Sequence, residues 1–376
     1  MAKVAATRFG ETYDVAMHPG PGALARHWSL SPGPWSTPLD ITSVVLLLGC
    51  AAVIYFSCEA FVNGVEWLGH RLHLGQTATG TVLAAFGTAL PESVVTLVAV
   101  AFGSTPAQKE IGIGAALGGP LALSTVAYAV VGIALLLKAR RLGRRPEVEV
   151  NARRLRRDQL WFLVIFALKI ALGVVVLSFK PWLGILFLAA YALYTWRELS
   201  REEAGFEEED LQPLKIRPRD PAPALGWAIL QTGAALLVIF AASRVFVKQL
   251  EAVGSALGLD PQLAALLFSP IATELPEVMN AVIWVRQGKE RLALANISGA
   301  MMIQATVPTA FGLFFTSWIL SASSILAATV TAVAVMFLQW IFCAQRVNSF
   351  KLALVGWLYA VFAAILIAQR IGGPPG

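Results

Sequence analysis

Two short phrases of the sequence place glutamates inside otherwise apolar segments. "IATELPEVMN" covers residues 271–280 and contains Glu274 and Glu277, whereas "FGTALPESVV" covers residues 86–95 and contains Glu92. An ionised carboxylate in apolar surroundings is costly unless it is paired, protonated or bound to a cation. The two phrases therefore mark a candidate functional site, and their shared pattern indicates a shared role.

Each phrase also supplies oxygen atoms beside the glutamate that follows its proline. A proline directly precedes Glu92 and Glu277, and because proline has no N–H, the carbonyls four residues earlier lose their helical partner. A threonine lies four residues before each glutamate, which is the same face of a helix. Carboxylate, carbonyl and hydroxyl oxygens are hard donors that suit Ca²⁺ and Na⁺ rather than soft metals. The candidate cation ligands are Glu92, Glu277, Glu274, Thr88, Thr273, Gly87 and Ala272.

A segment rich in small residues follows each phrase. Residues 112–120 read "GIGAALGGP" and residues 293–301 read "ALANISGAM". Small side chains at this spacing allow close approach of neighbouring helices, so packing is the simplest interpretation of most of them. Asn296 is the exception, because its amide oxygen could complete a cation site opposite Glu277.

The elements that must position these residues are membrane helices. The chain has 376 residues, of which 57% are hydrophobic and only 14% are charged, and its mean hydropathy is +0.68. A soluble domain carries about a quarter charged residues. Apolar runs of about twenty residues, the length that crosses a bilayer, recur along the chain. The composition predicts an all-α polytopic membrane protein, whose partner is the lipid bilayer.

Ten transmembrane helices are predicted from these runs. They lie at 41–68, 78–102, 111–137, 159–179, 181–196, 224–249, 261–285, 292–316, 322–344 and 350–369. Aligning Glu92 with Glu277 brings the two T-x-L-P-E runs into register. The offset covers five predicted spans, and because five is odd, corresponding helices cross the membrane in opposite directions. The sequence therefore predicts two inverted five-helix repeats.

The predicted boundaries follow from composition. The first repeat is 41–196 and the second is 224–370, with a polar tail at 1–40 and a charged linker at 197–223. The loop 138–157 holds nine Lys and Arg residues, which predicts that it is cytoplasmic. Both termini then face outward, in a multi-pass protein of the plasma or inner membrane. The loop is interpreted as a topology signal, although binding of a lipid or regulator is an alternative.

Several other function classes find no support in the sequence. The net charge of +6 is explained by the basic cytoplasmic loops and requires no nucleic-acid partner. The three cysteines lack metal-ligand spacing, and no HExxH, GxSxG or P-loop pattern is present. We therefore expect no enzyme activity and no bound cofactor, with inorganic cations as the partners. The oligomeric state does not follow from the sequence.

Taken together, these motifs resemble those of the cation/Ca²⁺ exchanger superfamily, and the chain is similar to a divergent prokaryotic-type member. That family carries a G-T-S-x-P-E phrase in its second and seventh helices, which residues 87–92 and 272–277 match here. The resemblance implies a ten-helix antiporter with alternating access, in which Glu92 and Glu277 bind Ca²⁺ in exchange for Na⁺. It implies supporting oxygens at Thr88 and Thr273, and places Asn296 at the position of a polar ligand.

The chain also departs from that family pattern. The motif serine is Ala89 in the first phrase and Glu274 in the second, and asparagines of the following phrases are replaced by Ala115, Pro120 and Met301. Carboxylate charge rises while neutral donors are lost, which favours a divalent ion or protons over several Na⁺ ions. We expect a secondary active antiporter that exchanges Ca²⁺ for Na⁺ or H⁺. The alternatives are an H⁺-coupled exchanger that does not use Na⁺, and a non-transporting membrane protein that retains the fold.

Overall fold

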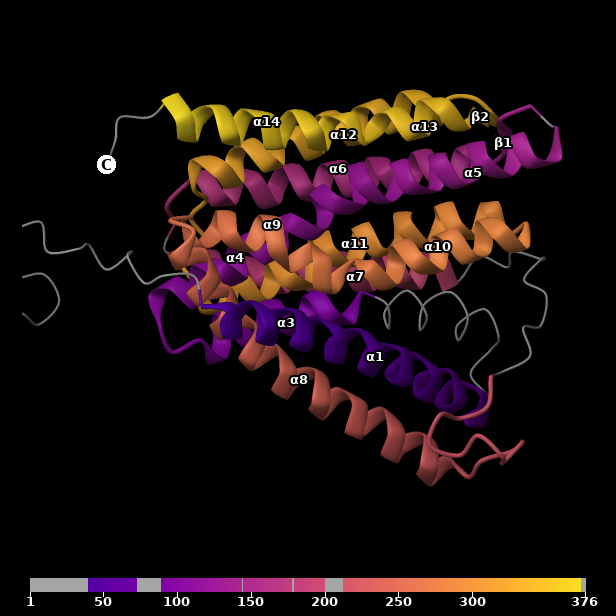
Figure 1. Cartoon of the computed structure of the whole chain (residues 1–376), viewed down its shortest axis with the longest axis horizontal. Helices are drawn as coiled ribbons and strands as arrows, with labels where there is room; N and C mark the ends of the chain where they lie inside the picture. The colour runs from indigo at the N-terminus through magenta and orange to yellow at the C-terminus, as the bar shows by residue number, and fades with distance from the viewer. Residues whose placement is uncertain (1–39, 73–88, 144, 178, 200–211, 373–376) are drawn as a thin grey trace, which may run out of the picture. The chain divides into compact units, whose positions relative to one another are not determined.

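Helices account for almost all of the described chain (Figure 1). The structure is a computed structural model that describes residues 40–72, 89–143, 145–177, 179–199 and 212–372. Residues 1–39 of the predicted tail and the predicted ligands Gly87 and Thr88 lie outside the described residues. All elements below belong to the unit formed by residues 37–376.

The helices of the first half correspond to the first five predicted spans. They are α1 (Ile41–Arg71), α3 (Leu90–Phe102), α4 (Pro106–Ala122), a π-helical turn (Leu123–Ala127), α5 (Tyr128–Leu142), α6 (Ala152–Val174) and α7 (Lys180–Leu199). The helix α4 continues through the π-helical turn into α5, which gives one long apolar segment. The prediction that residues 152–157 belong to a loop was wrong, because α6 already begins at Ala152.

The helices of the second half follow the same order. They are α8 (Leu225–Ala256), α9 (Pro261–Thr273), α10 (Leu275–Gln287), α11 (Glu290–Phe315), α12 (Ala322–Ile341), α13 (Ser349–Val355) and α14 (Trp357–Gly372). Within the described residues, six helical segments are long and apolar enough to cross a membrane, and the bent pair α9–α10 makes a seventh. These segments describe a multi-pass membrane protein, whereas the ten-span inverted repeat stays a prediction.

The helices α1 and α8 lie side by side and are the most extensively paired helices of the fold (Figure 1). Gly64 allows this approach, because a Cβ at Gly64 would overlap the hydroxyl of Thr232 on α8. Phe61 and Phe246 come from the two helices and are both buried in one apolar cluster. Their outward faces carry exposed apolar side chains, as expected of helices that face lipid.

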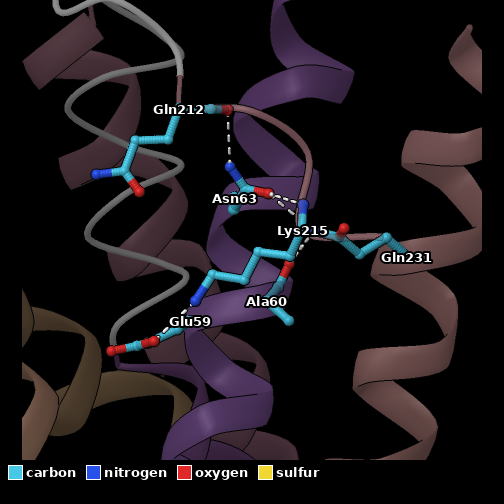
Figure 2. Close-up of polar contacts among 6 residues, drawn as sticks. All are labelled: Glu59, Ala60, Asn63, Gln212, Lys215 and Gln231. Atoms are coloured by element: carbon cyan, nitrogen blue, oxygen red, sulfur yellow. Dashed lines mark hydrogen bonds and ion pairs between the residues drawn. The ribbon is translucent and has the colours of Figure 1, made fainter. Parts of the chain in front are cut away.

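The segment Gln212–Pro223, which ends the predicted linker, is bonded to α1 and α8 (Figure 2). Asn63 on α1 is buried and makes three hydrogen bonds. Its Nδ2 donates to the carbonyl of Gln212 at 3.2 Å, and its Oδ1 accepts from the backbone N–H of Lys215 at 3.1 Å and from Nε2 of Gln231 at 3.0 Å. The side chain of Asn63 thus bonds the end of the linker to both helices. We call residues 212–223, held in this way, the linker clasp.

A short antiparallel strand pair was not predicted. The strands β1 (Glu147–Glu149) and β2 (Arg346–Asn348) pair with Val148 opposite Val347. They join the connection between α5 and α6 to the connection between α12 and α13. Strands of three residues carry too little periodicity to be recognised in a sequence.

Candidate cation site

The second glutamate phrase lies at a break in the helix. The helix α9 ends at Thr273 and α10 begins at Leu275, with a bend of 43° between them. Pro276 occupies the first turn of α10, where its missing N–H leaves no helical bond unmade. The predicted opening of the helix is therefore confirmed in the second half. In the first half, α3 begins at Leu90 with Pro91 in its first turn, and the residues before Ala89 are not described.

This arrangement places two glutamates in the first turns of helices. Glu92 lies in the first turn of α3 and Glu277 in the first turn of α10, and their exposed fractions are 1% and 0%. The N-terminal end of a helix carries partial positive charge, which stabilises a carboxylate there. The two side chains are close enough to interact electrostatically, together with Glu274. The structure therefore brings all three predicted carboxylates into one region.

A glycine of the small-residue segment makes room for Glu92. The carboxylate lies directly against the backbone of Gly119 on α4, where a Cβ would overlap it. Gly114 and Gly118 of the same helix face α9, where added Cβ atoms would meet the backbones of Gln262 and Leu266. The predicted close approach of these helices is confirmed. Both oxygens of Glu92 are buried and accept no hydrogen bond from a described amide, ammonium or hydroxyl group.

Glu274 has partners that the sequence did not indicate. Its Oε2 accepts a 2.6 Å hydrogen bond from Nε2 of Gln304 on α11, and its Oε1 accepts a 2.9 Å bond from the hydroxyl of Thr273. The sequence placed Thr273 on the face of Glu277, four residues later. The shared face of Thr273 and Glu277 stays a prediction, since the chain bends by 43° between α9 and α10.

Two further predicted ligands are buried in the same half. Ala272 is 2% exposed in the last turn of α9, and Asn296 is 8% exposed on α11, which packs against α10. The Nδ2 atom of Asn296 has no hydrogen-bond partner among the described residues. Within those residues, no three His, Cys, Asp or Glu side chains are arranged to hold a metal ion. The convergence of these ligands on one ion thus stays a proposal.

The sequence analysis missed a lysine in this region. Lys169 on α6 is fully buried, and its Nζ donates to the carbonyl of Ala116 at 2.6 Å and to the carbonyl of Gln304 at 3.3 Å. Glu92 acts on it electrostatically. The signal was present in the sequence, since Lys169 is a charged residue in the predicted span 159–179 and such residues are rare and functional in membrane helices.

Aromatic rings cover the lysine. The Nζ atom lies 5.7 Å from the ring centre of Phe166 and 5.9 Å from that of Trp318, distances at which an aromatic face attracts a cation. Trp318 is itself fixed by a 3.1 Å bond from its Nε1 to the carbonyl of Lys169. Trp318 lies between α11 and α12, so the connection between these helices encloses the lysine.

The buried charged groups determine which ligands this region can bind. Three buried carboxylates carry up to three negative charges, and one buried ammonium offsets part of them. The remaining negative charge is suited to a cation with hard oxygen preference. Such a region is chemically suited to inorganic cations or protons.

Comparison with known proteins agrees with this description. The chain is 27% identical over 273 residues to the inner membrane protein YrbG of Escherichia coli (strain K12). The aligned region covers 71% of this chain and 78% of that protein. It is 24% identical over 292 residues to the putative antiporter CaxA of Alkalimonas amylolytica, covering 76% and 84% of the two chains.

Solved structures share the fold. The crystal structure of the H⁺/Ca²⁺ exchanger CAX matches with a TM-score of 0.67 at 18% identity, covering 90% of this chain and 83% of that one. The sodium-calcium exchanger NCX_Mj, soaked with Na⁺ and Sr²⁺, matches with a TM-score of 0.56 at 17% identity, covering 86% and 98%.

A family-level match covers both halves of the chain. The model of the family described as sodium/calcium exchanger protein matches residues 42–199 and again residues 227–368. Each matched range contains one glutamate phrase and the helices that surround it. The chain therefore belongs to the sodium/calcium exchanger family.

Proposed function

We propose that this protein is a secondary active cation antiporter that moves Ca²⁺ across the membrane by alternating access, with the ion bound between Glu92 and Glu277. The observation that carries the proposal is the matched placement of these two carboxylates. Each is buried, each lies in the first turn of a helix whose second residue is a proline, and the two interact electrostatically. Broken helices at such positions are typical of ion sites in secondary transporters.

Further oxygen donors near the pair support a divalent ion. Glu274 adds a third carboxylate, and Thr273 and the Ala272 carbonyl lie on the last turn of α9. Asn296 lies on α11, which packs against α10. In the proposal, Gly87 and Thr88 serve the first half as Ala272 and Thr273 serve the second. Membership of the exchanger family and the fold shared with CAX and NCX_Mj support transport over a purely structural role.

A second candidate, exchange of Ca²⁺ for H⁺ without Na⁺, is favoured by one observation. Lys169 already supplies a positive charge beside Glu92, and Glu274 replaces the serine of the family phrase. A fixed cation leaves less negative charge for several Na⁺ ions, whereas the carboxylates can carry protons. We also propose that the termini face outward, because the basic connections then lie on the cytoplasmic side.

Transport by purified protein in vesicles tests both candidates. We expect uptake of radioactive Ca²⁺ driven by a Na⁺ gradient, a pH gradient or both, and uptake driven by pH alone in Na⁺-free buffer identifies proton coupling. Glu277→Gln and Glu92→Gln should each reduce uptake by more than about tenfold, since losing a charged ligand costs about 1.5–3 kcal/mol.

The control is Glu59→Gln, because Glu59 forms an exposed ion pair with Lys215 at 2.7 Å. It should leave uptake unchanged. Full transport by Glu277→Gln would contradict the site assignment. Absence of saturable cation binding to the wild-type protein by calorimetry would favour the non-transporting alternative.

A further inference from the structure

The ammonium group of Lys169 occupies a place built from two backbone carbonyls. Its Nζ bonds to the carbonyl of Ala116 on α4 at 2.6 Å and to the carbonyl of Gln304 on α11 at 3.3 Å. Helical carbonyls normally accept from the N–H four residues later. The carbonyls of Ala116 and Gln304 instead accept from Lys169, and the residues that follow them in the sequence explain why.

A proline stands four residues after each carbonyl. Pro120 follows Ala116 inside α4, and Pro308 follows Gln304 inside α11. Proline has no N–H, so neither carbonyl can make its ordinary helical bond. An unpaired carbonyl within a membrane protein is costly unless another group satisfies it. Two such carbonyls from two helices, directed at one point, are the kind of oxygen ligands that bind a cation.

The surroundings of this point also suit a positive charge. Glu92 acts electrostatically on the lysine, and the ring centres of Phe166 and Trp318 lie 5.7 and 5.9 Å from its Nζ. The lysine is fully buried, so no solvent competes for its hydrogen bonds. Among the described residues, the partners of the ammonium are two carbonyl oxygens, two aromatic faces and, through space, the Glu92 carboxylate. An unattached monovalent cation would find the same partners.

We infer that Lys169 is a tethered cation that fills a monovalent-cation site formed by the Ala116 and Gln304 carbonyls, so that this protein binds no free Na⁺ there. The inference rests on the proposed function, because it assigns one part of the proposed transport site. It makes Lys169 a determinant of which cations take part in exchange. Its test measures binding, so the test does not depend on transport.

Thermal unfolding of purified protein in detergent tests the inference, with NaCl replaced by choline chloride at constant ionic strength. Choline is too large for the site, whereas Na⁺ can be held by carbonyl oxygens. Lys169→Met removes the ammonium but keeps an unbranched apolar side chain. Its melting temperature should rise with NaCl by about 4 °C more than that of the wild-type protein at saturating salt, because only the variant has gained this site.

Lys180→Met is the matched control. Lys180 also donates to two carbonyls, those of Ser317 and Trp318, each at 3.1 Å, but it lies at the start of α7 and neither carbonyl precedes a proline by four residues. This variant should gain no response to Na⁺. Adding Pro120→Ala to Lys169→Met restores an N–H that can bond to the Ala116 carbonyl, so the response to Na⁺ should weaken.

The opposite outcomes overturn the inference. A folded Lys169→Met protein with no response to Na⁺ would show that the carbonyl pair is not a cation site. An equal response in the wild-type protein would show that Lys169 does not block it. If Lys169→Met is recovered only when purified in NaCl, the inference is supported.

If Lys169→Met is recovered in neither salt, Lys169→Ala is purified with and without methylammonium, which can replace the missing ammonium group. If methylammonium does not restore folded protein, the result counts against the inference. Ca²⁺ uptake by the wild-type protein is measured separately. Loss of the proposed function and failure of this inference therefore give different results.

Discussion

The carboxylate of Glu92 lies against the backbone of Gly119, in a space that any side chain at residue 119 would fill. The contact joins α3 to α4 and determines where the carboxylate can lie. A side chain at residue 119 would therefore displace the carboxylate of the proposed site.

Gly119→Ala should abolish most transport without unfolding the protein. The added Cβ would overlap the carboxylate of Glu92 and displace it, and small displacements of a functional group cost about tenfold or more in activity. The measurement is Ca²⁺ uptake into vesicles, with the melting temperature as a check on folding. Gly49→Ala is the control, because nothing lies within 4 Å of an added Cβ on that residue of α1. Unchanged uptake by Gly119→Ala would mean that the position of Glu92 is not critical.

Gln304→Leu should destabilise the protein by about 1–3 kcal/mol, because it leaves a buried oxygen of Glu274 without its 2.6 Å donor. Thermal unfolding in detergent measures the effect. Gln339→Leu is the control, because it makes the same substitution and also removes one hydrogen bond, from Nε2 to the carbonyl of Arg156 at 2.7 Å. That bond is exposed, whereas the bond to Glu274 is buried. A loss of stability in Gln339→Leu equal to that in Gln304→Leu would argue that burial of the Glu274 bond is unimportant.

Pro276→Ala should reduce transport by straightening the break between α9 and α10. An alanine restores the N–H that can bond to the carbonyl of Ala272, and this favours a continuous helix in place of the 43° bend. The measurement is Ca²⁺ uptake, combined with the distance between spin labels attached to α9 and α10. Pro261→Ala changes the first residue of α9, outside the break, and should have little effect. A spin-label distance that does not change would refute the proposed role of Pro276.

Asn63→Leu should release the linker clasp from α1 and α8. The substitution removes the three hydrogen bonds that Asn63 makes to Gln212, Lys215 and Gln231. Hydrogen exchange of the amides in residues 212–223 should become faster, because local opening then costs less free energy. Lys215→Met removes only the exposed ion pair with Glu59 and should leave exchange nearly unchanged. Equal exchange in Asn63→Leu and the wild-type protein would show that other contacts hold the clasp.

The sequence alone determined the class of the protein and marked the carboxylates of the proposed site. Apolar runs of bilayer length predicted the helices, because only a helix satisfies its backbone within a membrane. The repeated phrase with a proline before Glu92 and Glu277 predicted buried carboxylates beside broken helices, and the break before Pro276 is present. These predictions succeeded because proline chemistry and burial of charge are local properties that a sequence states directly.

Only the tertiary structure decided which groups meet the carboxylates. Lys169 on α6 lies far from both phrases in the sequence, and no spacing relates it to Glu92 or to the carbonyls of Ala116 and Gln304. Gln304 reaches Glu274 across thirty positions of the chain for the same reason. Contacts between helices depend on how the helices pack, and packing follows from the shapes of many side chains at once. For this reason the carboxylates could be predicted from the sequence, whereas the position of the Lys169 ammonium near Glu92 could be seen only in the folded structure.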